Sequence, residues 1–313
     1  MNNEDEKEQA ALWETASKSE GEEKVDALLQ LSYNAAGRRE YVESLAFCET
    51  AKEVYEGLGA LASNMKLAHI YFGIGHSLRN LKRATEAANA LETSVQLYEE
   101  VGSEEAVHIL NEEGDAWYEA KEYQKSYDAY RRGIENSNPD TCDYIVARNY
   151  VDAGTALERL KQWDKALTYF LEARSRFKKL KDPTTVAHCD EEISYCYYWL
   201  NDGVNSLHYA QLALDFAVTA NNESHLIWAK SRMALAKKRL AEYQEALELF
   251  SEVKLMMTRQ EYPPWKAIVK QERQMADILQ KLGRETEGNE ILRRISSLAD
   301  IVLNEEEKEQ DLG

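Results

Sequence analysis

Apolar positions recur at steps of three and four residues through most of this chain, which is the spacing of one face of an α-helix. The pattern is clearest between Arg148 and Lys181, where two amphipathic stretches flank a short polar turn. Their apolar and small positions are Tyr150, Ala153, Gly154, Leu157, Ala166, Phe170 and Ala173. Small residues allow two helices to approach closely, and large ones fill the remaining gaps. This stretch therefore predicts a helical hairpin.

The same hairpin pattern repeats along the chain. The small residue of each predicted second helix falls at Ser44, Ala87, Ser126, Ala166, Ser206, Ala246 and Gly288, with spacings of 43, 39, 40, 40, 40 and 42 residues. The matching small residues of the first helices are Ser32, Gly75, Gly114, Gly154, Ser194, Ala234 and Ala276. A period sustained over this length predicts about seven stacked hairpins.

The stretch from Tyr150 to Ala173 has an aromatic residue, a small pair and a bulky residue, followed by Ala-x3-Phe-x2-Ala. This stretch resembles a tetratricopeptide repeat. The resemblance implies an all-α fold, a right-handed superhelical α-solenoid of about seven hairpins. We expect residues 1–24 to form an acidic segment with a capping helix, residues 25–303 the solenoid, and residues 304–313 an acidic tail. The period is about six residues longer than the usual ~34, and we expect longer second helices to account for it. Repeats of this length are similar to those of bacterial peptide-sensing regulators.

Composition narrows the classes of partner. The formal net charge is −18 and the pI is about 4.9, which disfavours direct binding to nucleic acid or to an anionic membrane. The C-terminal third differs, because residues 226–300 hold fourteen Lys and Arg against eleven Asp and Glu. No apolar run suits a signal peptide or a membrane span, and the four cysteines suit a reducing compartment, so we expect a cytoplasmic protein.

The resemblance also implies a concave groove, lined by the first helices, where ligands of such repeats usually lie. The middle of this groove is predicted to be polar and rich in acids and histidines, through His108, Asn111, Asp115, Tyr118, Arg148, Asp152, His188 and Glu191. Its C-terminal part is predicted to be aromatic and basic, through Tyr195, Tyr198, Trp199, Trp228, Arg232, Arg239 and Arg273. Aromatic rings beside guanidinium groups suit a peptide with apolar and acidic side chains. The alternative is that the rings pack between hairpins and the charges form a solvated face.

No motif indicates catalysis, a metal or a cofactor. Gly73-Ile74-Gly75 lies inside a helical pattern, so it indicates close packing and not a phosphate loop. His69 and His76 are two helical turns apart, about 10 Å, too far to share one metal ion unaided. We therefore expect no enzyme, no metal site and no cofactor.

The function that the sequence favours is a non-catalytic interaction module, or adaptor, that binds a peptide or helix of a partner protein in the groove. Two alternatives remain open. One is a regulatory receptor for a short signalling peptide that changes the shape of the superhelix. The other is an acidic decoy that inhibits a nucleic-acid-binding protein. The sequence makes no prediction of the oligomeric state.

Overall fold

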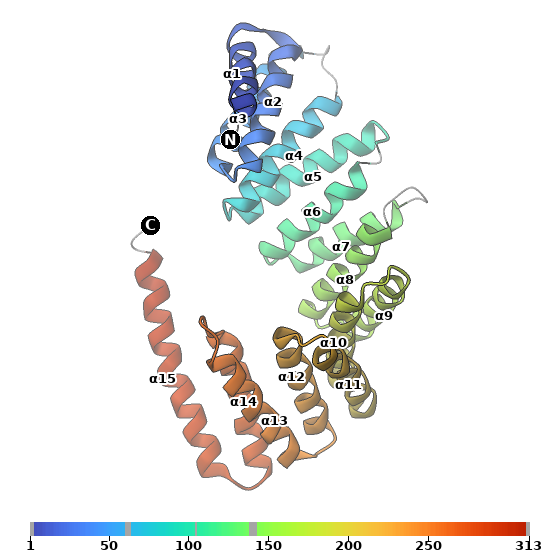
Figure 1. Ribbon diagram of the computed structural model, residues 1–313, viewed down its shortest axis with the longest axis vertical. Coiled ribbons are helices and arrows are strands. Elements are labelled where there is room, and N and C mark those ends of the chain that lie inside the picture. The colour runs from blue at the N-terminus through green and yellow to red at the C-terminus, as the bar shows by residue number, and fades with distance from the viewer. Residues whose placement is uncertain (1–2, 60–63, 104, 138–142, 311–313) are drawn as a thin grey trace. The chain divides into compact units, whose positions relative to one another are not determined.

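The computed structural model describes residues 3–59, 64–103, 105–137 and 143–310, and the side chains among them from residue 9 to residue 297. This part of the chain contains fifteen α-helices and no strand. Consecutive helices pack against each other along each unit of the chain (Figure 1). The all-α fold of tandem hairpins is as predicted. No helix among the described residues is long and apolar enough to span a membrane.

The chain divides into two compact units, residues 1–162 and 163–313. The helices of the first unit are α1 (Asn3–Lys18), α2 (Gly21–Gly37), α3 (Tyr41–Glu56), α4 (Asn64–Asn80), α5 (Ala84–Glu100), α6 (Ala106–Glu119), α7 (Tyr123–Glu135) and α8 (Asp143–Arg159). Those of the second unit are α9 (Trp163–Lys179), α10 (Pro183–Trp199), α11 (Gly203–Thr219), α12 (Glu223–Arg239), α13 (Tyr243–Thr258), α14 (Trp265–Lys281) and α15 (Glu285–Gln310). The even-numbered helices from α2 to α14 are the first helices of the hairpins. Helix α1 packs against α2, at the place predicted for a cap.

All fourteen small residues that define the period are buried. The hydroxyls of Ser32 and Ser44 are 2.9 Å apart. A Cβ atom added to Gly75 would lie 2.6 Å from Cγ of Leu91. Small side chains are therefore required at these positions by packing.

The turn inside every hairpin contains one residue in the left-handed conformation. These residues are Arg39, Lys82, Lys121, Lys161, Asn201, Ala241 and Gly283, and they follow the same period as the small residues. The amide of the next residue donates to a carbonyl five positions earlier, as from Glu40 to Ala35 at 2.9 Å. This bond closes the end of each first helix in a Schellman-type turn.

The expectation of longer second helices is wrong for six of the seven hairpins. In these, the second helix is as long as the first or one residue shorter, for example 17 residues in both α10 and α11. Only α15, with 26 residues, exceeds its partner α14, with 17. Each helix of a hairpin buries its apolar stripe along the other, so an extension of one helix is useful only where the other follows it.

Three of the four cysteines, Cys48, Cys189 and Cys196, are buried and are not joined in disulfides, whereas Cys142 lies outside the described residues. Burial raises the pKa of the Cys48 thiol to about 11 and that of Cys189 to about 12. Both thiols are therefore protonated at neutral pH and pack as small hydrophobic side chains.

Candidate functional site

Helix α10 presents a run of aromatic side chains on the surface formed by the first helices of the second unit. The rings of Tyr195 and Tyr198 are nearly parallel, with centroids 6.3 Å apart. Trp199 stacks on Trp163, the first residue of α9, with centroids 5.2 Å apart and an interplanar angle of 10°. These contacts hold the rings in fixed positions, which lowers the entropy that a ligand-binding ring would lose.

Cations from α12 and α14 lie over these rings. The guanidinium of Arg232 is 4.0 Å from the ring centroid of Tyr195, and that of Arg239 is 4.4 Å from the ring centroid of Tyr198. The Nζ atom of Lys270 is 5.2 Å from the ring centroid of Tyr195 and donates to its hydroxyl at 3.3 Å. We call the set of Trp163, Tyr195, Tyr198, Trp199, Trp228, Arg232, Arg239 and Lys270 the aromatic–basic surface.

The cations of the aromatic–basic surface are unevenly neutralised. Arg232 is buried and pairs with Glu192 of α10 at 2.8 Å. Arg239 and Lys270 form no ion pair with any side chain in the described part of the chain. The surface therefore carries positive charge without an internal counter-ion, within a protein of net charge −18.

A small cleft opens between these side chains, with a volume of about 90 Å³. Its lining includes Tyr195, Tyr198, Trp199, Trp228, Arg232 and Lys270. Trp199 and Trp228 are each 45% exposed, whereas Tyr198 is buried. Arg273 of α14, predicted to belong to this group, is exposed and does not line the cleft.

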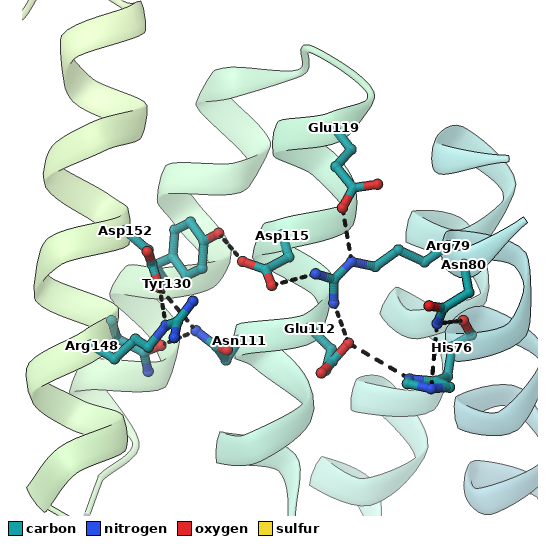
Figure 2. Close-up of polar contacts among 11 residues, drawn as sticks. His76, Arg79, Asn80, Asn111, Glu112, Asp115, Glu119, Tyr130, Arg148 and Asp152 are labelled. Carbon is teal, nitrogen blue, oxygen red and sulfur yellow. Dashed lines mark hydrogen bonds and ion pairs between the residues drawn. The ribbon is translucent and has the colours of Figure 1, made fainter. Parts of the chain in front are cut away.

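The predicted polar middle of the groove forms a hydrogen-bonded network in the first unit (Figure 2). Arg79 of α4 pairs with three carboxylates of α6: Glu112, Asp115 at 2.7 Å and Glu119 at 3.1 Å. The hydroxyl of Tyr130 donates to Asp115 at 2.6 Å. Each of these polar groups therefore forms its hydrogen bond or ion pair with another group of the same protein.

A second part of the network joins α6 to α8. Asn111 donates to Asn149 at 2.7 Å, and Arg148 donates to Asp152 at 3.3 Å (Figure 2). Burial raises the pKa of Asp152 to about 6, and the charge of Asp115 adds to that effect while Arg148 opposes it. Negative charge is therefore crowded on this surface.

Two further predicted residues lie beside this network. The hydroxyl of Tyr118 accepts a hydrogen bond from Nε of Arg159 at 2.7 Å. His108 is exposed near the start of α6, and none of the contacts described here involves its ring. The structure thus brings Asn111, Asp115, Arg148 and Asp152 together and leaves His108 apart.

Glu191 and His188 form a separate cluster with His225 of α12. The buried carboxylate of Glu191 is 2.8 Å from Nδ1 of His225 and 3.7 Å from Nδ1 of His188. Burial alone would raise the pKa of Glu191, but the two histidine hydrogen bonds outweigh it and lower that pKa. The hydrogen bond to Glu191 raises the pKa of His188. Glu191 therefore positions the start of α12 and is not exposed to a ligand.

Trp163 and His225 were missed by the sequence reasoning. A signal for Trp163 existed, because an aromatic residue opens the second helix at Tyr41, Tyr123, Trp163 and Tyr243. His225 follows the capping residue Asn222, whose side chain accepts from the His225 amide at 3.1 Å. Nothing in the sequence indicates that its ring turns toward Glu191.

No metal-binding group of three or more His, Cys, Asp or Glu residues occurs in the portion of the chain that the structure describes. The polar clusters of Arg79 and of Glu191 are held together by internal ion pairs and hydrogen bonds. The arrangement is suited to binding through rings and charges.

Comparison with solved structures identifies the architecture. The chain superimposes on the apo form of RapI with a TM-score of 0.62 at 13% identity, covering 90% of this chain and 99% of that one. The fold is tetratricopeptide-like. A signal-transduction ATPase from Pyrococcus horikoshii, which has a tetratricopeptide repeat sensor, matches with a TM-score of 0.65 at 14% identity. That match covers 95% of this chain and 45% of the ATPase chain.

A third similar structure is NprR in complex with its cognate peptide NprX, with a TM-score of 0.59 at 13% identity, covering 90% of this chain and 80% of that one. No protein-family model matches the tetratricopeptide-like chain, and no curated protein matches it in sequence. At these identities the likeness extends to the fold.

Proposed function

We propose that this chain is a non-catalytic binding protein that holds a peptide or helix of a partner protein on the aromatic–basic surface of its second unit. One observation carries the proposal. Two tryptophans, Trp199 and Trp228, are 45% exposed beside a cleft. Lys270 lines this cleft and Arg239 lies over the ring of Tyr198, and neither cation has an internal counter-ion in the described side chains. A buried structural cluster would instead enclose its rings and pair its charges.

The chemistry of the surface specifies the ligand class. Trp and Arg are the residues that contribute most to binding energy when a partner covers them. An apolar side chain of the ligand would cover Trp199 and Trp228, and a carboxylate would pair with Arg239 or Lys270. We therefore expect a segment in which an aromatic or aliphatic residue is close to Asp or Glu.

A matched set of variants tests this site. Random peptides displayed on phage would be selected on the full-length protein, and the enriched sequences synthesised with a fluorescent label for anisotropy titration. Trp228→Ala and Lys270→Glu should each weaken binding by about tenfold or more. Trp265→Ala is the control, because Trp265 is 54% exposed at the start of α14 and does not line the cleft.

The proposal fails if the selected peptides lack an apolar–acidic class, or if Trp228→Ala and Trp265→Ala bind such peptides equally well. Far-UV circular dichroism of each variant would show that helix content is unchanged.

A regulatory peptide receptor is the second candidate. It is favoured by the similarity to NprR, which is seen with its cognate peptide, and by the division of this chain into two compact units. A receptor of this kind changes its shape when the peptide binds, whereas an adaptor does not. Small-angle scattering with a saturating selected peptide distinguishes them, since an unchanged radius of gyration would exclude the receptor.

A further inference from the structure

The second hairpin lacks a side chain that every other hairpin has. Two positions before the small residue of each first helix, the seven residues are Gln30, Gly73, Glu112, Asp152, Glu192, Arg232 and Gln274. Six of them are long or polar, and Glu112, Asp152, Glu192 and Arg232 reach ion-pair partners on this surface. Gly73 places no side chain on this surface.

Two residues that line the same cavity as Gly73 are also smaller than most of their counterparts. Cys48 of α3 occupies the position that holds Leu91, Tyr130, Phe170, Ala210, Phe250 and Leu292 in the other second helices. Ala36 of α2 occupies the position that holds Arg79, Tyr118, Glu158, Tyr198, Lys238 and Gln280 in the other first helices. A Cβ atom added to Gly73 would lie 2.5 Å from Sγ of Cys48, so the glycine and the thiol fit together.

These small residues border a cavity of about 540 Å³ in the first unit, between α2, α3 and α4. Leu29, Tyr33 and Phe72 provide apolar walls, and Tyr33 is 75% exposed. The volume lies within the range of pockets that hold small ligands, and it exceeds the space that a single large side chain needs.

The polar atoms on the floor of the cavity are already satisfied. The hydroxyl of Ser32 lies 2.9 Å from that of Ser44 and 2.9 Å from the thiol of Cys48. Ser44 in turn lies 2.9 Å from the hydroxyl of Ser77. An apolar group that packs on this floor therefore leaves these three hydroxyls and the thiol paired.

The charge around the cavity is negative. On one side Lys66 faces two carboxylates, Glu22 at 3.0 Å and Asp26 at 2.8 Å. On the other side Arg79 faces three, those of Glu112, Asp115 and Glu119 (Figure 2). Each cation is thus outnumbered by carboxylates, and a ligand with positive charge would be attracted.

We propose that the cavity bordered by Ala36, Cys48 and Gly73 holds one bulky apolar side chain of a partner segment that carries Lys or Arg on either side of it. This site is separate from the aromatic–basic surface and has the opposite charge preference, so the first unit selects a basic segment and the second an acidic one. The repeat does not require small residues at these three positions, because most of the other hairpins fold with larger residues there.

Three labelled peptides with blocked ends test the proposal on the full-length protein by fluorescence anisotropy. Their sequences are Arg-Lys-Phe-Lys-Arg, Arg-Lys-Ala-Lys-Arg and Glu-Asp-Phe-Asp-Glu. In the Trp228→Ala variant, whose aromatic–basic surface is weakened, the first should bind at least about tenfold more tightly than either of the others, since the second lacks the apolar anchor and the third carries the wrong charge for this cavity.

Ala36→Tyr fills the cavity with the residue that the third and fifth hairpins carry at this position, Tyr118 and Tyr198, and is therefore compatible with the fold. It should reduce binding of the Phe peptide to the level of the Ala peptide. Ala46→Tyr is the matched control, because Ala46 is exposed on α3 and does not line the cavity, and it should leave binding unchanged.

Absence of binding of the basic Phe peptide at millimolar concentration overturns the proposal, as does equal binding by the wild type and Ala36→Tyr. Tight binding of the acidic peptide that Ala36→Tyr abolishes would overturn the charge preference. Trp228→Ala separates this site from the function proposed above, because it should weaken apolar–acidic peptides and leave the basic Phe peptide unaffected.

Discussion

Gly114 offers the most direct test of why the repeat requires small residues. A Cβ atom added there would lie 2.5, 2.7 and 2.8 Å from three atoms of the Tyr130 ring. Tyr130 is 2% exposed, and its hydroxyl is fixed by the 2.6 Å hydrogen bond to Asp115. Gly37, at the end of α2, has no atom within 4 Å of the corresponding position. The same substitution, glycine to alanine, therefore meets two different environments.

The two variants should change stability in opposite directions. Alanine is favoured over glycine in a helix by about 1 kcal/mol. At Gly114 this gain is opposed by about 1–3 kcal/mol for overpacking a buried ring and by about 1.5–3 kcal/mol if the hydrogen bond of Tyr130 to the carboxylate is lost. We expect Gly114→Ala to lower the free energy of unfolding by about 2–4 kcal/mol, and Gly37→Ala to raise it by about 0.5–1 kcal/mol.

Urea unfolding followed by far-UV circular dichroism measures both free energies. A double-mutant cycle with Tyr130→Ala isolates the contact, since Gly114→Ala should become stabilising by about 1 kcal/mol once the ring is removed. If Gly114→Ala and Gly37→Ala stabilise the protein equally, the packing explanation of the repeat pattern is refuted.

Three further outcomes are expected. Burial raises the pKa of Glu113 to about 7, so ionisation of its carboxyl destabilises the fold as the pH rises from about 4.5 to 7. In urea unfolding, Glu113→Gln should therefore stabilise the protein by up to about 3 kcal/mol more at pH 8 than at pH 4. The raised pKa of His188 contributes stability that is lost as pH rises through it, and the lowered pKa of Glu191 contributes stability that is lost as pH falls through it. Glu191→Gln should therefore cost most stability between pH 4.5 and 6.5, and an equal cost at pH 8.5 would contradict this reasoning. Ala241 has a φ of 62°, a left-handed backbone conformation that strains alanine by about 1 kcal/mol. Ala241→Gly should therefore raise the thermal midpoint of unfolding, and a lower midpoint would show that the turn is not strained.

The repeat itself could be predicted from the sequence. In every hairpin the small residues of the two helices are twelve residues apart, as with Ser32 and Ser44 or Gly75 and Ala87. Two helices that approach closely require small residues at the contact, so the spacing is visible in the sequence. The same period located the aromatic side chains of α10 and the cations of α12, which the structure brings together on one surface. Helix lengths were harder to predict, because no capping residue marks the ends of most second helices.

The candidate sites were only partly predictable, since a position on a helix face does not reveal which side chains meet across it. Glu191 was expected on the surface, yet it is buried between two histidines, one of which comes from the next first helix. Arg239 and Arg273 share the predicted face, but neither lines the cleft, and Arg239 lies instead over the ring of Tyr198. These outcomes depend on rotamers and on the distance between neighbouring helices.

The sequence by itself determined the all-α repeat architecture of this protein, the register of its hairpins and the charge contrast of its C-terminal third, because these follow from local periodicity and from composition. Only the tertiary structure decided which charges are neutralised and which surfaces are hollow. Arg79 pairs with three carboxylates from a helix more than thirty residues away, whereas Arg239 is left without a counter-ion in the described side chains. The cavity beside Gly73 likewise depends on three small residues from three helices, and their coincidence in space is a property of packing.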